Sequence, residues 1–174
     1  MAAAKSTSKQ GEAQLILAPL SEPPLHPRTI FLSGTTTAIK DDAVPWRDTI
    51  FQQLAKKPVT IYNPFRPDWG SDWKDLSHPS YREQLAWEVE HLDKADLVCV
   101  YLHPSTEAPI SLLELGLVAK RGSAAVVCVP DGFKHRANVL YVCEKFGCEV
   151  VEKMDDFVGY IEKHFELASD NVVE

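Results

Sequence analysis

Two glutamates stand out in the sequence because each lies among apolar residues. Glu114 falls within the run PISLLELG at 109–116, and Glu88 falls on an apolar stripe of a predicted helix, between Leu85 and Leu92. A lone carboxylate in such a setting is costly unless it is paired or used. An ionised carboxylate is the nucleophile that an electrophilic sugar carbon requires, and a second carboxyl group with a raised pKa is suited to acid work. The pair therefore indicates attack at a sugar carbon.

Simpler explanations exist for both residues. Ser111 and Glu114 have the S-x-x-E spacing of a helix capping box, and a local salt bridge with Arg66 or Arg82 would account for Glu88. Against the capping box, the helix that Ser111 opens is apolar nearly all round, so we expect it to be buried. We also expect a carboxylate in its first turn to stay ionised, because it feels the positive end of the helix dipole. Both explanations stay open at this point.

Short apolar runs alternate with longer helical patterns along the chain. Strands are predicted at 29–34, 59–62, 96–102, 124–130 and 148–151, with an extra edge strand at 14–20. Helices are predicted at 45–56, 79–94, 111–120, 135–146 and 155–167. Continuous apolar strands are typical of a parallel sheet covered on both faces. We therefore predict one α/β domain at 13–168, a Rossmann-like (flavodoxin-like) doubly wound parallel sheet, between a disordered tail at 1–12 and a short tail at 169–174.

In such sheets ligands bind beyond the carboxyl ends of the strands. The first predicted strand ends in Ser33, Gly34 and Thr35, where glycine allows backbone to approach a ligand closely; a tight turn explains this run equally well. The second leads into a long loop at 62–81, a length typical of lids and binding loops. Its candidate binding residues are Asn63, Arg66, Asp68 and Trp69. Aromatic rings beside polar groups suit a flat nucleobase, and a loop that packs its own rings over the sheet is the alternative.

The composition argues against several other classes of protein. The net charge of −7 argues against a nucleic-acid-binding protein, which needs a basic face. No apolar run reaches the roughly 18 residues of a membrane helix. The cysteines and histidines lack the spacing of metal ligands, so we predict no metal site. The apolar surroundings of the cysteines indicate buried free thiols and a reducing cytoplasm.

The chain resembles the nucleoside 2-deoxyribosyltransferase family, in particular its fungal and bacterial "like" branch. The segments that carry the resemblance, between residues 28 and 142, are IFLSG, NPFRPDW, EQLAWEVEHLDKAD, PISLLELG and PDGFKHRANV. The resemblance implies that Glu114, in the E-L-G motif, is the nucleophile at C1′, and that Glu88 contacts the nucleobase and assists its protonation. It also implies that Asn138 reaches the sugar, often in a neighbouring subunit's site, and hence a homo-oligomer of at least two chains. Ala108 stands where better-known members carry an aspartate that hydrogen-bonds the sugar.

The residues and the resemblance together predict a transferase that exchanges the nucleobase of 2′-deoxynucleosides through a covalent glycosyl-enzyme, with no metal or organic cofactor. The first alternative is a hydrolase in which water replaces the second base. The related hydrolases bind a 5′-phosphate, for which the run Thr35–Thr37 would serve. The second alternative is a nucleotide-binding module without turnover, which has no need of an ionised nucleophile.

Overall fold

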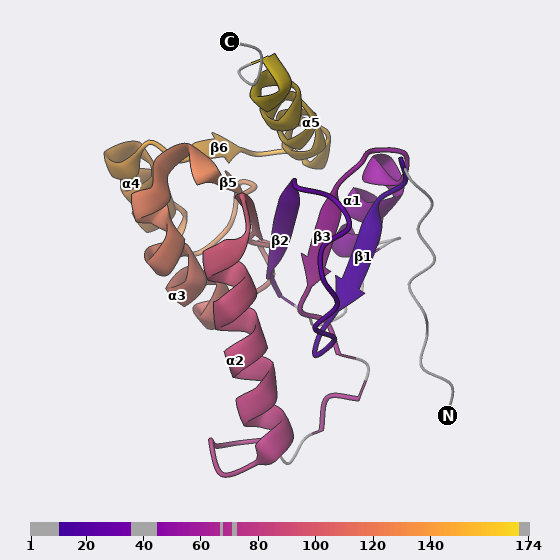
Figure 1. Ribbon diagram of the computed structural model, residues 1–174. Helices are drawn as coiled ribbons and strands as arrows, with labels where there is room; N and C mark the ends of the chain where they lie inside the picture. Colours follow the sequence, from indigo (N-terminus) through magenta and orange to yellow (C-terminus); the bar gives the residue numbers. More distant parts are fainter. Residues whose placement is uncertain (1–10, 36–44, 67, 71–72, 171–174) are drawn as a thin grey trace.

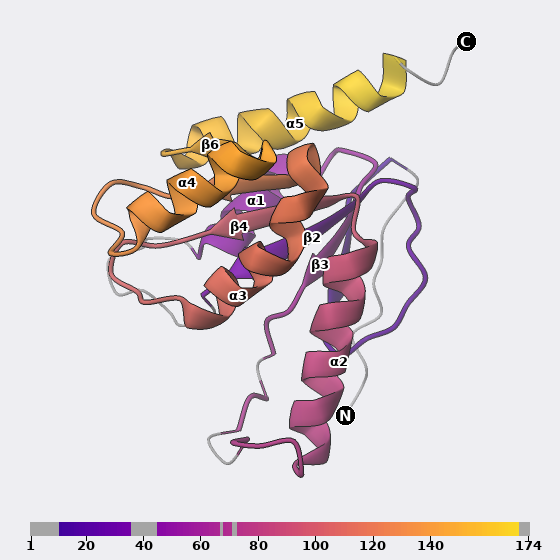
Figure 2. The ribbon, with the colours of Figure 1, turned by 90° about the vertical axis from the view of Figure 1, so that its left-hand side faces the viewer.

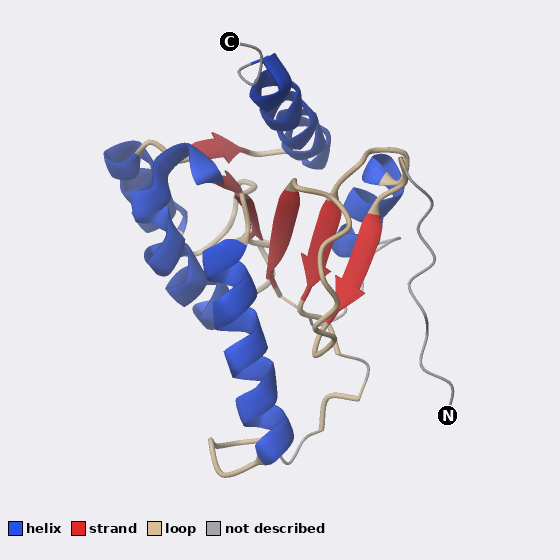
Figure 3. Ribbon diagram, viewed as in Figure 1, coloured by secondary structure: helices blue, strands red, loops and turns tan. Residues whose placement is uncertain are grey.

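Six parallel strands form a single sheet in the order β1-β3-β2-β4-β5-β6 (Figures 1 and 3). The computed structural model describes residues 11–35, 45–66, 68–70 and 73–170. The strands are Gln14–Leu17 (β1), Thr29–Gly34 (β2), Thr60–Asn63 (β3), Leu97–Tyr101 (β4), Ala125–Cys128 (β5) and Glu149–Val151 (β6). Apart from the edge strand β1, this is the strand order of flavodoxin-like sheets. The predicted fold class is confirmed.

Helices cover both faces of this sheet. They are Trp46–Leu54 (α1), Pro79–Lys94 (α2), Pro109–Val118 (α3), Arg136–Phe146 (α4) and Met154–Asp170 (α5). Helices α2, α3 and α4 lie over one face, and α1 and α5 lie over the other (Figures 1 and 2). Side chains alternate along each strand, so Phe31 of β2 packs in the core under α2, α3 and α4, while Ile30 and Leu32 pack in the core under α1 and α5. Both sides of the strand are buried, which is why its sequence is apolar without interruption.

Local sequence signals set most helix ends, but α3 differs from its prediction. Gly147 ends α4 in a left-handed conformation (φ 72°), as expected of a glycine at a helix carboxyl end. Helix α3 begins at Pro109, two residues earlier than predicted, because proline suits the first helical position. Ala108 is the N-cap, with an uncommon φ of 43°. Ser111 is therefore the third helical residue and Glu114 lies in the second turn, so the capping-box explanation is wrong.

The expectation that α3 is buried all round is also wrong for the single chain. Ile110, Leu113 and Leu117 form one stripe along the helix and are 57%, 62% and 58% exposed. Ser111, Leu115 and Val118 supply its buried side. Helix α3 thus has an apolar face that the described part of the chain does not cover.

The two strands at the middle of the fold lead to opposite faces of the sheet. Strand β2 pairs with β4 up to Gly34 and Tyr101, and the chain then enters α1 on one face and α3 on the other. This divergence leaves a crevice at the carboxyl edge, the usual ligand position in doubly wound folds. The amino-terminal part of α2 and the loop before it extend past the same edge (Figure 1). Within the described residues, no helix is both long and apolar enough to span a bilayer.

Candidate active site

A cleft of about 420 Å³ opens at the crevice between β2 and β4, a size typical of small-molecule sites. Glu88 of α2 and Glu114 of α3 both line it. Gly34 and Thr35, at the end of β2, line it too. Trp69, Tyr81 and Leu85 add aromatic and apolar surface near Glu88. The fold therefore brings both carboxylates and the end of β2 into one cleft.

The carboxylate of Glu114 is held by a short hydrogen bond from the neighbouring strand. The buried Ser33 hydroxyl of β2 donates to Glu114 Oε2 at 2.6 Å. Burial raises the pKa of Glu114 above its usual value, while the Ser33 hydrogen bond and the positive charge of Arg47 oppose the rise. The expected support from the first turn of the helix dipole is absent because Glu114 lies in the second turn. The Ser33 hydroxyl and the positive charge of Arg47 favour the ionised form of Glu114 instead.

The environment of Glu88 favours its protonated form. Burial is the largest cause and repulsion by Glu114 adds to it, and together they raise the pKa of Glu88 to about 7, against opposing effects of Gln84 and Arg47. The amide Nε2 of the buried Gln84, one turn earlier on α2, donates to Glu88 Oε1 at 2.8 Å and to the Pro64 carbonyl at 2.8 Å. Glu88 is therefore a fixed group that gains or loses a proton near neutral pH.

The salt-bridge explanation for Glu88 is wrong. Arg66 pairs instead with Asp68 at 2.8 Å and Glu83 at 3.1 Å, and Arg82 donates to the Leu76 carbonyl. The predicted buried stripe of α2 also shifts. Its core-facing residues are Gln84, Trp87, His91 and Leu92, whereas Tyr81, Leu85 and Glu88 are half-buried and face the cleft.

Of the four binding residues predicted in the long loop, Trp69 lines the cleft. Its ring lies edge-on to Tyr81, with centroids 5.7 Å apart, and half of the residue is exposed. Arg66 and Asp68 are engaged with each other, and Arg66 also lies 4.8 Å from the Trp73 ring centroid. Asn63 accepts the Phe65 amide hydrogen bond in a turn. The loop thus packs partly on itself and presents one aromatic ring to the cleft.

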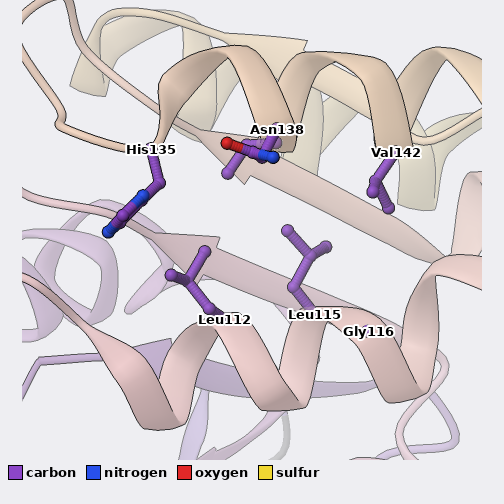
Figure 4. Close-up of a pocket in the computed structure, with 7 residues that line it drawn as sticks. Leu112, Leu115, Gly116, His135, Asn138 and Val142 are labelled. Atoms are coloured by element: carbon purple, nitrogen blue, oxygen red, sulfur yellow. The ribbon is translucent and has the colours of Figure 1, made fainter.

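Asn138 lies in a different hollow. It is exposed on α4 and lines a groove of about 330 Å³ between α3 and α4 (Figure 4). The other residues of this groove are mainly apolar: Leu112, Leu115, Gly116, His135, Val139 and Val142. Within one chain, Asn138 and Glu114 therefore do not share a hollow. Thr36 and Thr37 of the predicted threonine run lie outside the described residues.

Two residues near the carboxylates were not predicted from the sequence. Gln84 stands four residues before Glu88, so helical spacing alone could have paired them. Arg47 is the second residue of α1, where the helix dipole disfavours a cation. The presence of a cation at this unfavourable position was the signal in the sequence that Arg47 has a role beyond its helix. Across the described part of the chain, no group of three or more His, Cys, Asp or Glu side chains is placed to hold a metal ion.

Comparison with known proteins identifies the family. The family described as "Nucleoside 2-deoxyribosyltransferase like" matches residues 27–133, more than half of the chain. No curated protein matches the sequence. A conserved protein from Enterococcus faecalis V583 has the same fold, with a TM-score of 0.56 and 16% identity over 79% of this chain and 98% of its own. Glu88 and Glu114 lie inside the matched residues, and Asn138 lies beyond them. The chain belongs to the nucleoside 2-deoxyribosyltransferase-like family.

Proposed function

We propose that this protein exchanges the nucleobase of 2′-deoxynucleosides through a covalent glycosyl-enzyme on Glu114. The observation that carries the proposal is the pair of carboxyl groups in one cleft with different supports. Glu114 accepts a hydroxyl hydrogen bond that favours its ionised form, whereas burial holds the pKa of Glu88 near 7. One group is thus suited to attack and the other to proton transfer.

The proposed reaction has two balanced steps. In the first, the Glu114 oxygen that does not contact Ser33 attacks C1′. The C1′–N bond breaks, its electron pair stays on the base, and Glu88 donates the proton that the leaving base requires. In the second, a nitrogen of an incoming base attacks C1′, Glu114 leaves as a carboxylate, and the proton of the incoming base returns to Glu88. No redox partner or metal ion enters either step.

The walls of the cleft suit a nucleoside. Trp69 and Tyr81 present aromatic surface beside Glu88, and a flat base stacks well on such rings. The described lining holds three acidic residues, Glu88, Glu107 and Glu114, but no lysine or arginine. A 5′-phosphate would find no cation in this lining and would be repelled by the ionised Glu114. This charge pattern favours nucleosides over nucleotides, and so disfavours the alternative of a hydrolase specific for 5′-phosphates.

A single assay separates the candidate functions. The protein is incubated with deoxyinosine, with and without free adenine, and the products are resolved by chromatography. We expect deoxyadenosine in the presence of adenine. Release of hypoxanthine alone would indicate a hydrolase, and no product would indicate a binding module. Replacing deoxyinosine with its 5′-monophosphate tests the nucleoside preference, which a faster reaction of the nucleotide would contradict.

We also propose that the protein is a homo-oligomer in which Asn138 serves the site of a neighbouring subunit. Asn138 is exposed and lies apart from Glu114 of its own chain. The stripe of Ile110, Leu113 and Leu117 lies on α3, the helix that also carries Glu114, and Tyr141 on α4 is 70% exposed. Exposed apolar and aromatic side chains of this kind are typical of subunit interfaces.

A further inference from the structure

Arg47 is a buried cation near both carboxyl groups of the candidate site, although it does not line the cleft itself. Its guanidinium donates to three backbone carbonyls at the end of β2: Thr35 at 2.6 Å, Gly34 at 2.8 Å and Leu32 at 3.3 Å. The side chain is 6% exposed and stacks on Trp46, with Cζ 4.4 Å from the ring centroid. These contacts surround Ser33, the residue that donates to Glu114.

The packing leaves the end of β2 little freedom. A Cβ atom on Gly34 would lie 2.7 Å from the Trp46 ring and 2.8 Å from the Tyr101 carbonyl oxygen. Trp46 and Arg47, neighbours in the first turn of α1, therefore hold the backbone on both sides of Ser33. Any shift of the first turn of α1 would therefore move the Ser33 hydroxyl relative to Glu114.

The charge of Arg47 has no direct carboxylate partner among the described residues. Its negative neighbours act at longer range, with Glu114 first, then Glu88 and Asp48. Burial lowers the pKa of Arg47 to about 10, and its buried Nε has no hydrogen-bond partner within the described part of the chain. Burying a charge and an unsatisfied N–H group costs stability. A side chain with a packing role alone would be apolar here.

We propose that Arg47 is a positioning residue for the reaction proposed above: it fixes Ser33 against Glu114 and keeps Glu114 ionised from a distance. This inference rests on the proposed function of Glu114 as the nucleophile. Because the guanidinium bonds to carbonyl groups and not to Glu114, it favours the carboxylate without occupying the attacking oxygen. A direct ion pair would hold that oxygen and weaken it as a nucleophile.

Other charged and titratable groups surround Glu114 and must be held constant in a test. Glu88 and Tyr81 on α2 and Glu107 before α3 line the cleft with Glu114, while Asp48 on α1 acts on Arg47 and Tyr101 on β4 packs against Trp46. Glu107 is paired with Lys134 at 2.9 Å and with His135 at 3.5 Å. None of them is changed by a substitution at Arg47.

The test compares Arg47→Met, which removes the charge, with Arg47→Lys, which keeps it. The readout is the pH at which kcat/KM falls on the acid side, where Glu114 becomes protonated. Loss of a nearby positive charge raises a carboxyl pKa, so we expect Arg47→Met to move this acid limb upward by about half a pH unit or more. We expect Arg47→Lys to leave the limb in place while lowering kcat, since lysine cannot bond to the carbonyls in the same geometry.

Arg121 offers a matched control. It too donates to three backbone carbonyls, those of Leu92, Asp93 and Ala95, but none of these residues lines the cleft. We expect Arg121→Met to leave the acid limb unmoved. Should Arg47→Met not fold, Arg47→Gln, a neutral side chain that still donates hydrogen bonds, takes its place. A folded neutral variant with an unmoved acid limb would overturn the proposal, even if its kcat is low.

A second readout keeps this inference separate from the proposed function. If the wild-type protein neither exchanges nor releases bases, the proposed function fails. Carbon-13 NMR of the glutamate carboxyl groups, with Glu114 assigned from a Glu114→Gln variant, still measures the pKa of Glu114 in wild-type and Arg47→Met protein. We expect a higher Glu114 pKa in the variant. An equal value would remove the electrostatic role whatever the activity.

Discussion

Helix α3 separates two hollows of similar size and opposite chemistry. On one side, the cleft of about 420 Å³ contains Glu88 and Glu114. A buried hydrogen-bond donor orients each carboxyl group: Gln84, one turn earlier on α2, for Glu88 and Ser33 of β2 for Glu114. On the other, the groove of about 330 Å³ is lined mostly by aliphatic side chains (Figure 4). Fixed polar groups with perturbed pKa values characterise reaction sites, whereas apolar surface suits contact with another chain. We infer that the same helix serves chemistry on one side and assembly on the other.

The largest effect should come from removing the proposed nucleophile from the cleft. We expect Glu114→Ala to lower kcat by about 10⁴-fold or more, as nucleophile deletions do, while circular dichroism and the thermal midpoint show an intact fold. Glu107→Ala is the control, because Glu107 lines the same cleft but is exposed and paired with Lys134. A folded Glu114→Ala protein with more than about a tenth of wild-type activity would remove Glu114 from the role of nucleophile.

A smaller kinetic effect is expected from Glu88→Gln. Glutamine keeps the shape but donates no proton to the leaving base, so kcat should fall by about 10²-fold or more with little change in KM. In the wild-type protein, kcat/KM should also decline as the pH rises through about 7, where Glu88 of the free protein loses its proton. The exposed Glu90 on the same helix provides the control variant Glu90→Gln. An increase in KM alone would make Glu88 a binding residue.

The same Glu88→Gln change should alter stability in a pH-dependent way. The folded pKa of Glu88 is raised from 4.5 to about 7, so the stability contributed by its proton is fully present below about pH 4.5 and is lost as the pH rises through 7. Glutamine does not titrate. We therefore expect the variant to gain about 2–3 kcal/mol over wild type between pH 4 and pH 8. Denaturant unfolding at both pH values measures the difference, and a constant difference would contradict the raised pKa.

The proposal that Asn138 serves a neighbouring subunit is tested by mixing two variants. We expect Glu114→Ala and Asn138→Ala each to be inactive alone. After subunit exchange in a dimer, about a quarter of the sites should regain both residues, and activity should return to that extent. Exchange is followed by mass spectrometry of differently tagged chains. No recovery after demonstrated exchange, or a monomer at every working concentration, would place the whole site in one chain.

Much of the fold was predictable from the sequence because its signals are local. The uninterrupted apolar strands required a sheet covered on both faces, and Gly147 and Pro79 marked helix ends that the structure reproduces. The meeting of Glu88 and Glu114 was within reach too, since α2 and α3 follow two parallel strands, β3 and β4, whose carboxyl ends lie at the same edge of the sheet. These inferences need only periodicity and connectivity.

The remaining features depend on contacts between distant segments. Nothing local to Arg47 shows that its guanidinium reaches the carbonyls around Ser33, some 12 to 15 residues earlier. The start of α3 was misplaced because S-x-x-E spacing was preferred to the proline two residues before it. The apolar composition of α3 predicted burial within the chain, but composition cannot distinguish a helix buried in a core from one with an exposed apolar face.

The position of Arg47 near both carboxyl groups has a consequence for the energy balance of the proposed exchange. Before the first step the three groups sum to zero charge: Arg47 is positive, Glu114 negative and Glu88 neutral. After it, Glu114 is a neutral ester and Glu88 has become the carboxylate, so the sum is again zero. A single negative charge has crossed the cleft while remaining within the field of the same cation. Neither half of the exchange then creates a net charge in a poorly solvated space, and the intermediate can run forward or back with similar ease, as an enzyme that trades one base for another requires.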